Sequence, residues 1–132
     1  MIIDEQDRLN LIKYRLEEAD EAIVDVELSI QNERFRTAVN RIYYGCFYSL
    51  MALGLLHHYD SSKHNKLIGW FNKTFVHEGD VDPKYSAIIN ELYKCRTQND
   101  YESYVDFDKE TVLKMFEQMK EFIAEIKRIL NN

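Results

Sequence analysis

The sequence predicts an all-α protein: an antiparallel up-and-down four-helix bundle with an additional short helix, five helices in a single domain over residues 1–132. Three observations indicate this class. The chain contains only four glycines and one proline, so it has few of the breakers that a strand-rich fold requires. Apolar residues recur at alternating spacings of three and four, which is the helical period. The segments that separate these runs are short.

The first two helices are expected at about residues 4–30 and 35–57, with a short turn at residues 31–34 between them. The apolar stripe of the first helix consists of Leu9, Ile12, Leu16, Ala19, Ile23, Val26 and Ile30. The second helix is apolar nearly all round in its middle, so we expect it to be the most buried helix. Its surplus apolar surface favours a contact between two copies of the chain. Gly45 and Gly54 lie within this helix and indicate close packing against its neighbours.

A third and shorter helix is expected from about Lys63 to Val76, after a turn at residues 58–62 that contains good capping residues. Its apolar residues are Leu67, Ile68, Trp70, Phe71 and Phe75. Gly79 follows at the place where a glycine commonly ends a helix in the left-handed conformation. Because this helix is short, we expect it at the periphery of the bundle.

The fourth helix is expected to start at Asp82-Pro83, since a cap followed by proline is a favoured helix start, and to run to about Tyr101. Residues 102–107 form a linker, and Asp108 caps the fifth helix. The fifth helix again shows spacings of three and four, at Val112, Phe116, Met119, Ile123, Ile126 and Leu130.

Composition limits the classes of function. The net charge of −6 and the pI of about 5.2 argue against strong non-specific binding to nucleic acid, although a local basic patch remains compatible with them. Cys46 and Cys95 lie in different apolar segments and are expected to be reduced. The chain opens with no secretory signal and holds no run of the roughly 20 apolar residues that a membrane helix needs. We therefore expect a soluble cytoplasmic protein with no membrane partner.

Metal binding and nucleophilic catalysis find little support. The histidines at positions 57, 58, 64 and 77 lie at helix ends or in turns, where solvated side chains are the simplest expectation. A zinc site could combine His64 with Asp60 and one neighbouring histidine, but no cysteine or second carboxylate completes it. Neither cysteine belongs to a recognisable Cys/His arrangement, and no glycine-rich phosphate loop is present. We expect no metal and no cofactor.

The segment from Lys94 to Tyr101 is the most informative part of the chain. Arg96 and Asp100 are four residues apart, so they share one helix face and can pair. Arg96 also falls close to the apolar stripe of its helix, which consists of Tyr85, Ile88, Ile89 and Leu92. A guanidinium in this position is costly unless it is paired or has a ligand to bind. Two interpretations stay open: a structural ion pair with Asp100, or a ligand-binding arginine.

A second polar and aromatic segment lies on the second helix, at Asn40, Arg41, Tyr43 and Tyr44. These residues could simply border the core, with their hydroxyl groups reaching solvent. If the second and fourth helices are neighbours, however, the two segments form one site. An arginine with tyrosines suits a nucleotide, because the guanidinium pairs with phosphate and a ring can stack on a base.

With these residues the chain resembles the HEPN family of small helical bundles, in its branch of short stand-alone proteins. The strongest parts of the resemblance are residues 38–45 and the stretch from Arg96 to Asp100-Tyr101, and residues 75–79 and 81–82 also fit. The resemblance covers nearly the whole chain. It implies an antiparallel four-helix bundle with an extra short helix, a homodimer, and a cytoplasmic prokaryotic setting. It further implies a minimal nucleotidyltransferase as partner in a toxin–antitoxin pair.

Many HEPN proteins are metal-independent RNases whose motif is an arginine followed, after four to six residues, by a histidine. Counted from Arg96, the corresponding positions here are Tyr101, Glu102 and Ser103, and no histidine follows Arg96. The imidazole that would serve as acid or base near neutral pH is therefore missing from the motif. Arg96 and Tyr101 remain the only catalytic candidates. The resemblance also makes Tyr104, in the linker, a candidate for modification by the partner transferase.

Three hypotheses follow. The first is a dimeric nucleotide- or RNA-binding protein that works with a nucleotidyltransferase. Its predicted binding residues are Asn40, Tyr43, Tyr44, Arg96, Asp100 and Tyr101. The second is a divergent metal-independent RNase toxin, in which Arg96 stabilises the phosphate in the transition state. The third is a structural adaptor for a protein partner, in which Arg96 serves only to pair with Asp100.

Overall fold

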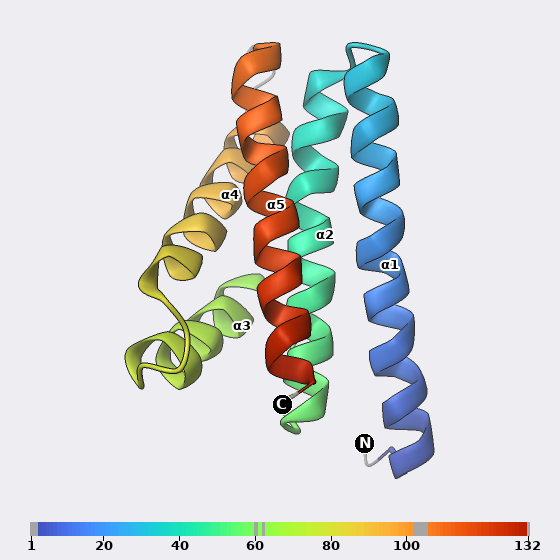
Figure 1. Cartoon of the computed structure of the whole chain (residues 1–132), viewed down its shortest axis with the longest axis vertical. Helices are drawn as coiled ribbons and strands as arrows, with labels where there is room; N and C mark the ends of the chain where they lie inside the picture. The colour runs from blue at the N-terminus through green and yellow to red at the C-terminus, as the bar shows by residue number, and fades with distance from the viewer. Residues whose placement is uncertain (1–2, 60, 62, 102–105, 132) are drawn as a thin grey trace.

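The computed structural model describes residues 3–59, 61, 63–101 and 106–131. Within these residues the chain forms helices and no strand, so the predicted all-α class is confirmed. The helices are α1 (Glu5–Gln31), α2 (Phe35–Leu56), α3 (His64–Phe71), α4 (Pro83–Tyr101) and α5 (Lys109–Leu130), with a π-helical segment, η1 (Asn72–His77), between α3 and α4. Figure 1 shows α1 and α4 running in one direction and α2 and α5 in the other. The described helices thus have the expected up-and-down arrangement.

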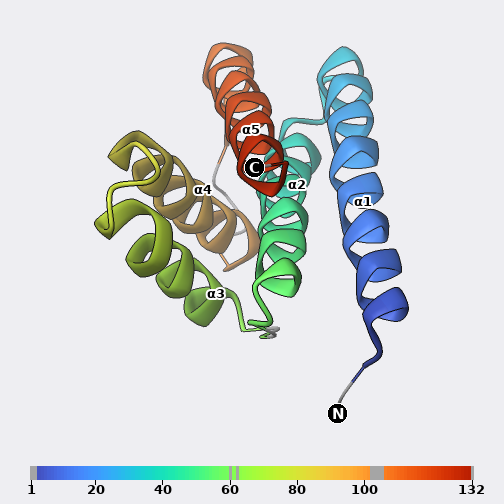
Figure 2. The ribbon, with the colours of Figure 1, turned by 60° about the horizontal axis from the view of Figure 1, so that its bottom comes forward.

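The second helix is the centre of the molecule. α2 packs against α1, α5 and α4, while α3 lies against α4 and α2, and η1 lies against α3 and α4. Figures 1 and 2 show α3 next to α4, to one side of the three long helices α1, α2 and α5. Thirteen of the 22 residues of α2 are buried, which explains why its sequence is apolar nearly all round. The peripheral place predicted for the third helix is confirmed.

Three helix starts have side-chain caps, and the sequence predicts two of these caps, at Asp82 and Asp108. The side chain of Asp4 accepts a hydrogen bond from the Asp7 N–H (2.8 Å), and that of Asp108 accepts one from the Thr111 N–H (2.8 Å). Asp82 accepts one from the Lys84 N–H (2.9 Å), directly before the proline that opens α4. These caps satisfy N–H groups that have no partner within the helix.

α1 and α2 both end with a residue in the left-handed conformation where glycine is usual. Glu33 has a φ of 56° and His58 a φ of 59°. After α2, the Tyr59 N–H donates to the Gly54 carbonyl (2.8 Å) and the His58 N–H to the Leu55 carbonyl (3.2 Å), which makes a Schellman motif. A Cβ on Gly54 would lie 2.7 Å from the Tyr59 carbonyl oxygen, so glycine is needed where the chain folds back. This turn returns the chain toward α2 before α3 begins.

The third helix differs from its prediction. The sequence predicts one helix from Lys63 to Val76, but α3 ends at Phe71 and residues 72–77 continue as a π-helix. The wider turn still buries Phe75 together with Leu67, Ile68 and Phe71. Periodicity cannot distinguish the two geometries over six residues, because both keep apolar side chains on one side. Gly79 has a φ of 90°, the left-handed conformation that its position predicts.

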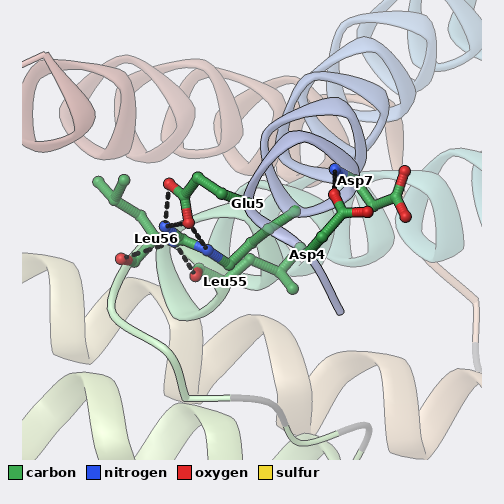
Figure 3. A network of polar contacts seen from close by, with 6 residues as sticks. Asp4, Glu5, Asp7, Leu55 and Leu56 are labelled. Carbon is green, nitrogen blue, oxygen red and sulfur yellow. Dashed lines mark hydrogen bonds and ion pairs between the residues drawn. The ribbon is translucent and has the colours of Figure 1, made fainter. Parts of the chain in front are cut away.

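An arginine near the start of α1 donates hydrogen bonds to the C-terminal end of α2. Arg8, which is 9% exposed, donates from Nη1 to the carbonyl oxygens of Leu55 (2.9 Å) and Leu56 (3.2 Å). Its Nε and Nη2 atoms donate to the Glu5 carboxylate. Figure 3 shows these bonds converging beside the last turn of α2. The guanidinium therefore gives the last carbonyl groups of α2 a charged donor, in addition to the His58 N–H that already donates to the Leu55 carbonyl.

The apolar stripe predicted for the first helix is only partly buried. Ala19, Val26 and Ile30 belong to the core, but Leu9 is 45% exposed. Figure 1 shows the N-terminal end of α1 extending beyond the end of α5, so this part of the helix packs on fewer neighbours. The prediction that Leu9 is part of the core is wrong for this reason.

Candidate phosphate-binding site

The two polar segments singled out in the sequence lie next to each other, because α2 and α4 pack together. The Arg96 Nη2 atom on α4 donates a hydrogen bond to the Tyr44 hydroxyl on α2 (2.9 Å). The Arg96 Cζ atom lies 5.5 Å from the centre of the Tyr44 ring and 6.0 Å from that of Tyr43. The guanidinium is therefore held against the two phenol rings while its residue stays partly exposed.

A second arginine shares the same ring. The Arg41 Cζ atom lies 5.2 Å from the centre of the Tyr44 ring, and its Nε and Nη2 atoms donate to the Asn40 side-chain oxygen (3.1 and 2.9 Å). Two guanidinium groups thus approach one tyrosine. An anion near this ring would be attracted by both positive charges. This arrangement indicates a place for phosphate or carboxylate.

A histidine that was expected to be solvated also belongs to this cluster. His64, the first residue of α3, has its Nδ1 atom 2.6 Å from the Tyr43 hydroxyl oxygen. Its ring stacks on Phe47, with 3.9 Å between the ring centres and 4° between the planes. The expectation that the four histidines are solvated turn residues is wrong for His64, because the turn after α2 brings α3 back onto the aromatic face of α2.

The surroundings fix the protonation of this pair. Burial raises the pKa of Tyr43, whose side chain is fully buried, so its hydroxyl keeps its proton. Burial, and secondly the charge of Arg96, lower the pKa of His64. At neutral pH both groups are therefore uncharged, and when the tyrosine donates to Nδ1, the remaining proton of the imidazole is on Nε2. A neutral histidine with that proton can donate a hydrogen bond to a ligand oxygen.

The predicted residues divide into three groups. Asn40, Tyr44 and Arg96 lie together and are partly exposed. Tyr43 also lies in the cluster, but it is fully buried, so its contribution is to hold His64. The side chains of Asp100 and Tyr101, and the whole of Tyr104, lie outside the described residues.

No pattern along the chain predicted the place of His64. The family motif places its imidazole after the arginine, whereas His64 lies 32 positions before Arg96. Only the tertiary return of the chain at Gly54 and Tyr59 brings it near. Its neighbourhood could be inferred once α3 was known to fold back against α2.

The described part of the chain offers no metal site and no activated thiol. Within it, no three side chains of the metal-binding types His, Cys, Asp and Glu gather in one place. Cys46 is fully buried, and burial raises the pKa of its thiol. Burial and the Glu91 carboxylate raise the pKa of Cys95 in the same direction, so neither thiol is an activated nucleophile. Among these residues, no helix has the length and apolar character needed to cross a lipid bilayer.

The sequence matches the HEPN domain family over residues 12–129. It is similar to a UPF0332 protein of Thermotoga maritima, with 33% identity over 122 residues that cover 92% of each chain. It is also similar to two proteins of Methanocaldococcus jannaschii named "putative toxin". They share 31% identity over 119 residues and 29% over 115 residues, which cover 90% and 87% of this chain and 88% and 78% of the relatives. These matches define the class as HEPN, and the chain belongs to that family.

Proposed function

We propose that this chain is a toxin-like HEPN protein that binds the phosphate of a nucleotide or of RNA, with Arg96 as the principal phosphate ligand. The observation that supports this most is the position of the Arg96 guanidinium, which the Tyr44 hydroxyl holds at 2.9 Å beside a second guanidinium. A guanidinium fixed in place loses less conformational entropy when it pairs with phosphate.

The other residues of the site have supporting roles in this proposal. Tyr44 orients Arg96, Asn40 orients Arg41, and Tyr43 orients His64, whose Nε2–H donates to a phosphate oxygen. Asp100 and Tyr101 keep the roles that the sequence suggests: Asp100 pairs with Arg96, and Tyr101 supplies a hydrogen bond or a stacking surface.

The proposed setting is a cytoplasmic homodimer that works with a minimal nucleotidyltransferase in a toxin–antitoxin pair. The support for it is the HEPN membership of the chain and the names of its two archaeal relatives. In this setting Tyr104 is the residue that the transferase modifies. Co-purification with the product of a neighbouring transferase gene, and mass spectrometry of residues 102–107 after incubation with nucleotide, test the partner and the modification.

Calorimetry with mononucleotides and short RNA tests the binding site. The wild-type protein binds, and Arg96→Ala weakens binding by at least about tenfold, because it removes a charge-assisted phosphate contact. Arg128→Ala is the matched control, since Arg128 is an exposed arginine on α5 that pairs with Glu125. Absence of binding by the wild type, or equal binding by Arg96→Ala, contradicts the proposal. Loss of the fold in Arg96→Ala without any wild-type binding favours the adaptor hypothesis.

His64 supports a second candidate function, a metal-independent RNase. Its imidazole lies in the same cluster as Arg96, so the site contains the type of group that the family motif lacks after Arg96. This function requires RNA cleavage in the presence of a chelator, loss of cleavage in both Arg96→Ala and His64→Gln, and loss of cell toxicity in the same variants. Purified protein that leaves RNA intact over a long incubation eliminates it.

A further inference from the structure

The exposed face of α2 carries a continuous stripe of side chains that extends the site in both directions. Most of the helix is buried, and the residues of this face are spaced alternately by three and four. We call them the α2 stripe: Arg34, Thr37, Arg41, Tyr44, Tyr48 and Met51. Arg34 and Thr37 are exposed, and the other four are partly exposed. The chemistry therefore changes along the helix from guanidinium to phenol to thioether.

The stripe lies in the basic part of an acidic protein. Residues 34–77 contain six of the 17 Lys and Arg residues and only one of the 23 Asp and Glu residues, Asp60. This segment has a net charge of +5 and the rest of the chain −11. α2 itself has no acidic residue. The overall charge of −6 therefore conceals a segment of positive net charge, which is favourable for binding a polyanion.

Aromatic rings continue the site beyond the arginines. The centres of the Tyr44 and Tyr48 rings are 6.1 Å apart, and the planes are tilted by 39°. Arg41 and Arg96 flank the Tyr44 ring, so its surroundings are already cationic. Tyr48 is one turn further and has no arginine over its ring among the described contacts. Tyr48 is therefore the better surface for a base.

The length of the stripe defines the size of the ligand. Tyr48 follows Arg34, at the N-terminal end of the stripe, by 14 residues, about 21 Å along the helix axis at a rise of about 1.5 Å per residue. One nucleotide is too short to reach from Arg34 with its phosphate to Tyr48 with its base. A ligand that reaches both residues therefore contains at least two nucleotides, and its bases must be unpaired to stack.

We infer that the α2 stripe binds a single-stranded oligonucleotide of at least two nucleotides, with Arg41 and Arg96 holding phosphates and Tyr48 stacking on a base. This inference rests on the proposed function, because it extends the Arg96 site to a longer ligand. Arg34, at the end of the stripe, is available to the next phosphate along the strand.

Fluorescence titrations with inorganic phosphate, AMP, and the tri- and tetranucleotides of riboadenosine and deoxyriboadenosine test the inference. Wild-type affinity rises at least about tenfold from AMP to the trinucleotide, since each stacked base adds a factor of this order. Tyr48→Ala removes most of this gain and changes AMP affinity less than about twofold, whereas Tyr48→Phe retains it. The ribo and deoxyribo series differ only if the site reads the 2′-hydroxyl, and a rise with length in either series supports the inference.

Two further variants keep the test independent of folding. Thr37→Glu, at an exposed position, adds an anion to the stripe and lowers trinucleotide affinity without disturbing the core. Tyr14→Ala removes a tyrosine that is 53% exposed on α1 and leaves affinity unchanged. Melting curves establish that each variant is folded.

The outcomes separate this inference from the proposed function. Equal wild-type affinity for AMP and trinucleotide, with binding lost in Arg96→Ala, overturns the inference and leaves the Arg96 site standing. No binding of any of these ligands overturns both. If Tyr48→Ala changes a dimer into a monomer in sedimentation and leaves trinucleotide affinity unchanged, the stripe is a contact between two copies of the chain, and the inference is wrong.

Discussion

The hydrogen bond between Tyr43 and His64 determines what the imidazole can do. The buried hydroxyl stays protonated, so it can donate to Nδ1 of the ring and leave the imidazole proton on Nε2. The groups facing His64 are Tyr43, Tyr44 and Phe47 from α2 and Tyr93 from α4, with the Arg96 charge also acting on it. No carboxylate is among these groups, and the pKa of His64 is lowered by burial and secondly by the Arg96 charge. A bound phosphate would act in the opposite sense and raise the pKa of His64.

Removing the Arg96 charge should therefore raise the pKa of His64. Arg96→Ala eliminates one of the two causes that lower it, while burial persists. An NMR titration that follows the ring protons of His64 measures the shift, with Arg128→Ala as the control for a lost arginine far from the site. An unchanged titration in Arg96→Ala would mean that the guanidinium does not act on the ring.

The lowered pKa of His64 also predicts how stability depends on pH. The unfolded chain has a histidine pKa of about 6.5, above the folded value, so the unfolded state binds the proton more readily. This contribution to stability is present in full above pH 6.5 and is lost as the pH falls below it toward the folded pKa. As the pH is lowered from 7 to 5, the melting temperature of His64→Gln should fall less steeply than that of the wild type. Parallel curves for the two proteins would contradict this assignment.

Among single residues, the sequence predicted only those site residues whose place follows from residues nearby in the chain. Arg96 beside an apolar stripe, and the tyrosine pair on the second helix, could be identified from helical spacing alone. His64 could not, because its partner Tyr43 is 21 positions away and the contact depends on the angle at which α3 returns. Long-range side-chain contacts of this kind are absent from local periodicity.

At the level of elements, Gly45 marks where three helices meet. A Cβ built on Gly45 would lie 2.3 Å from the Met119 Cε atom on α5 and 3.1 Å from the Ala22 Cβ atom on α1. The methionine end can move, but the alanine Cβ is fixed to the α1 backbone, so the close approach depends on glycine. The sequence prediction that this glycine permits close packing is supported by this geometry.

Two glycine-to-alanine variants should have opposite effects. Gly45→Ala overpacks the junction and should lower the free energy of unfolding by about 1–3 kcal/mol. Gly69→Ala, on the exposed face of α3 with nothing within 4 Å of the added Cβ, should raise it by about 0.5–1 kcal/mol, because alanine favours the helix. Urea denaturation measures both. A stabilisation of the same size in the two variants would show that helix propensity, and not packing, dominates.

The contact of Arg8 with the end of α2 allows a second comparison between elements. Arg8→Ala should lower the free energy of unfolding by about 1–3 kcal/mol, because it leaves the carbonyl groups of Leu55 and Leu56 without their charged donor. Arg128→Ala removes an exposed arginine that also pairs with a glutamate three residues away, and it should leave stability nearly unchanged. Thermal melts of the two variants give the comparison, and equal melting temperatures would contradict the role of Arg8.

Helix positions and starts could be predicted well, since apolar spacing and caps such as Asp108 are local properties. The ends of α1 and α2 show where local signals are insufficient. Glu33 and His58 adopt the left-handed conformation without being glycine, and the hydrogen bonds of the Schellman motif offset that strain. The π-helix after Phe71 was not predicted, because its different turn leaves the apolar pattern almost unchanged.

Across the whole molecule, the bundle brings a basic central segment and an acidic remainder into one compact unit. Total charge, read from the sequence as evidence against nucleic-acid binding, averages over this division. The positive charge of residues 34–77 supports anion binding only because α2 and α3 contact each other and also contact α4, which carries Arg96. The sequence did not predict that α2 and α4 are neighbours. It predicted only that the two segments form one site if these helices are neighbours, and the whole site depends on that contact.

The division of charge predicts the salt dependence of oligonucleotide binding. Each phosphate held on a single strand contributes about −0.7 to the slope of log affinity against log salt concentration, so contacts by Arg41 and Arg96 give a slope of about −1.4. Arg41→Ala should reduce the slope by about 0.7. Tyr48→Ala should weaken binding with the slope unchanged, because stacking releases no counterions. Trinucleotide titrations between about 50 and 300 mM salt measure these slopes. A wild-type slope near zero would mean that the two arginines do not hold phosphate, whatever the affinity.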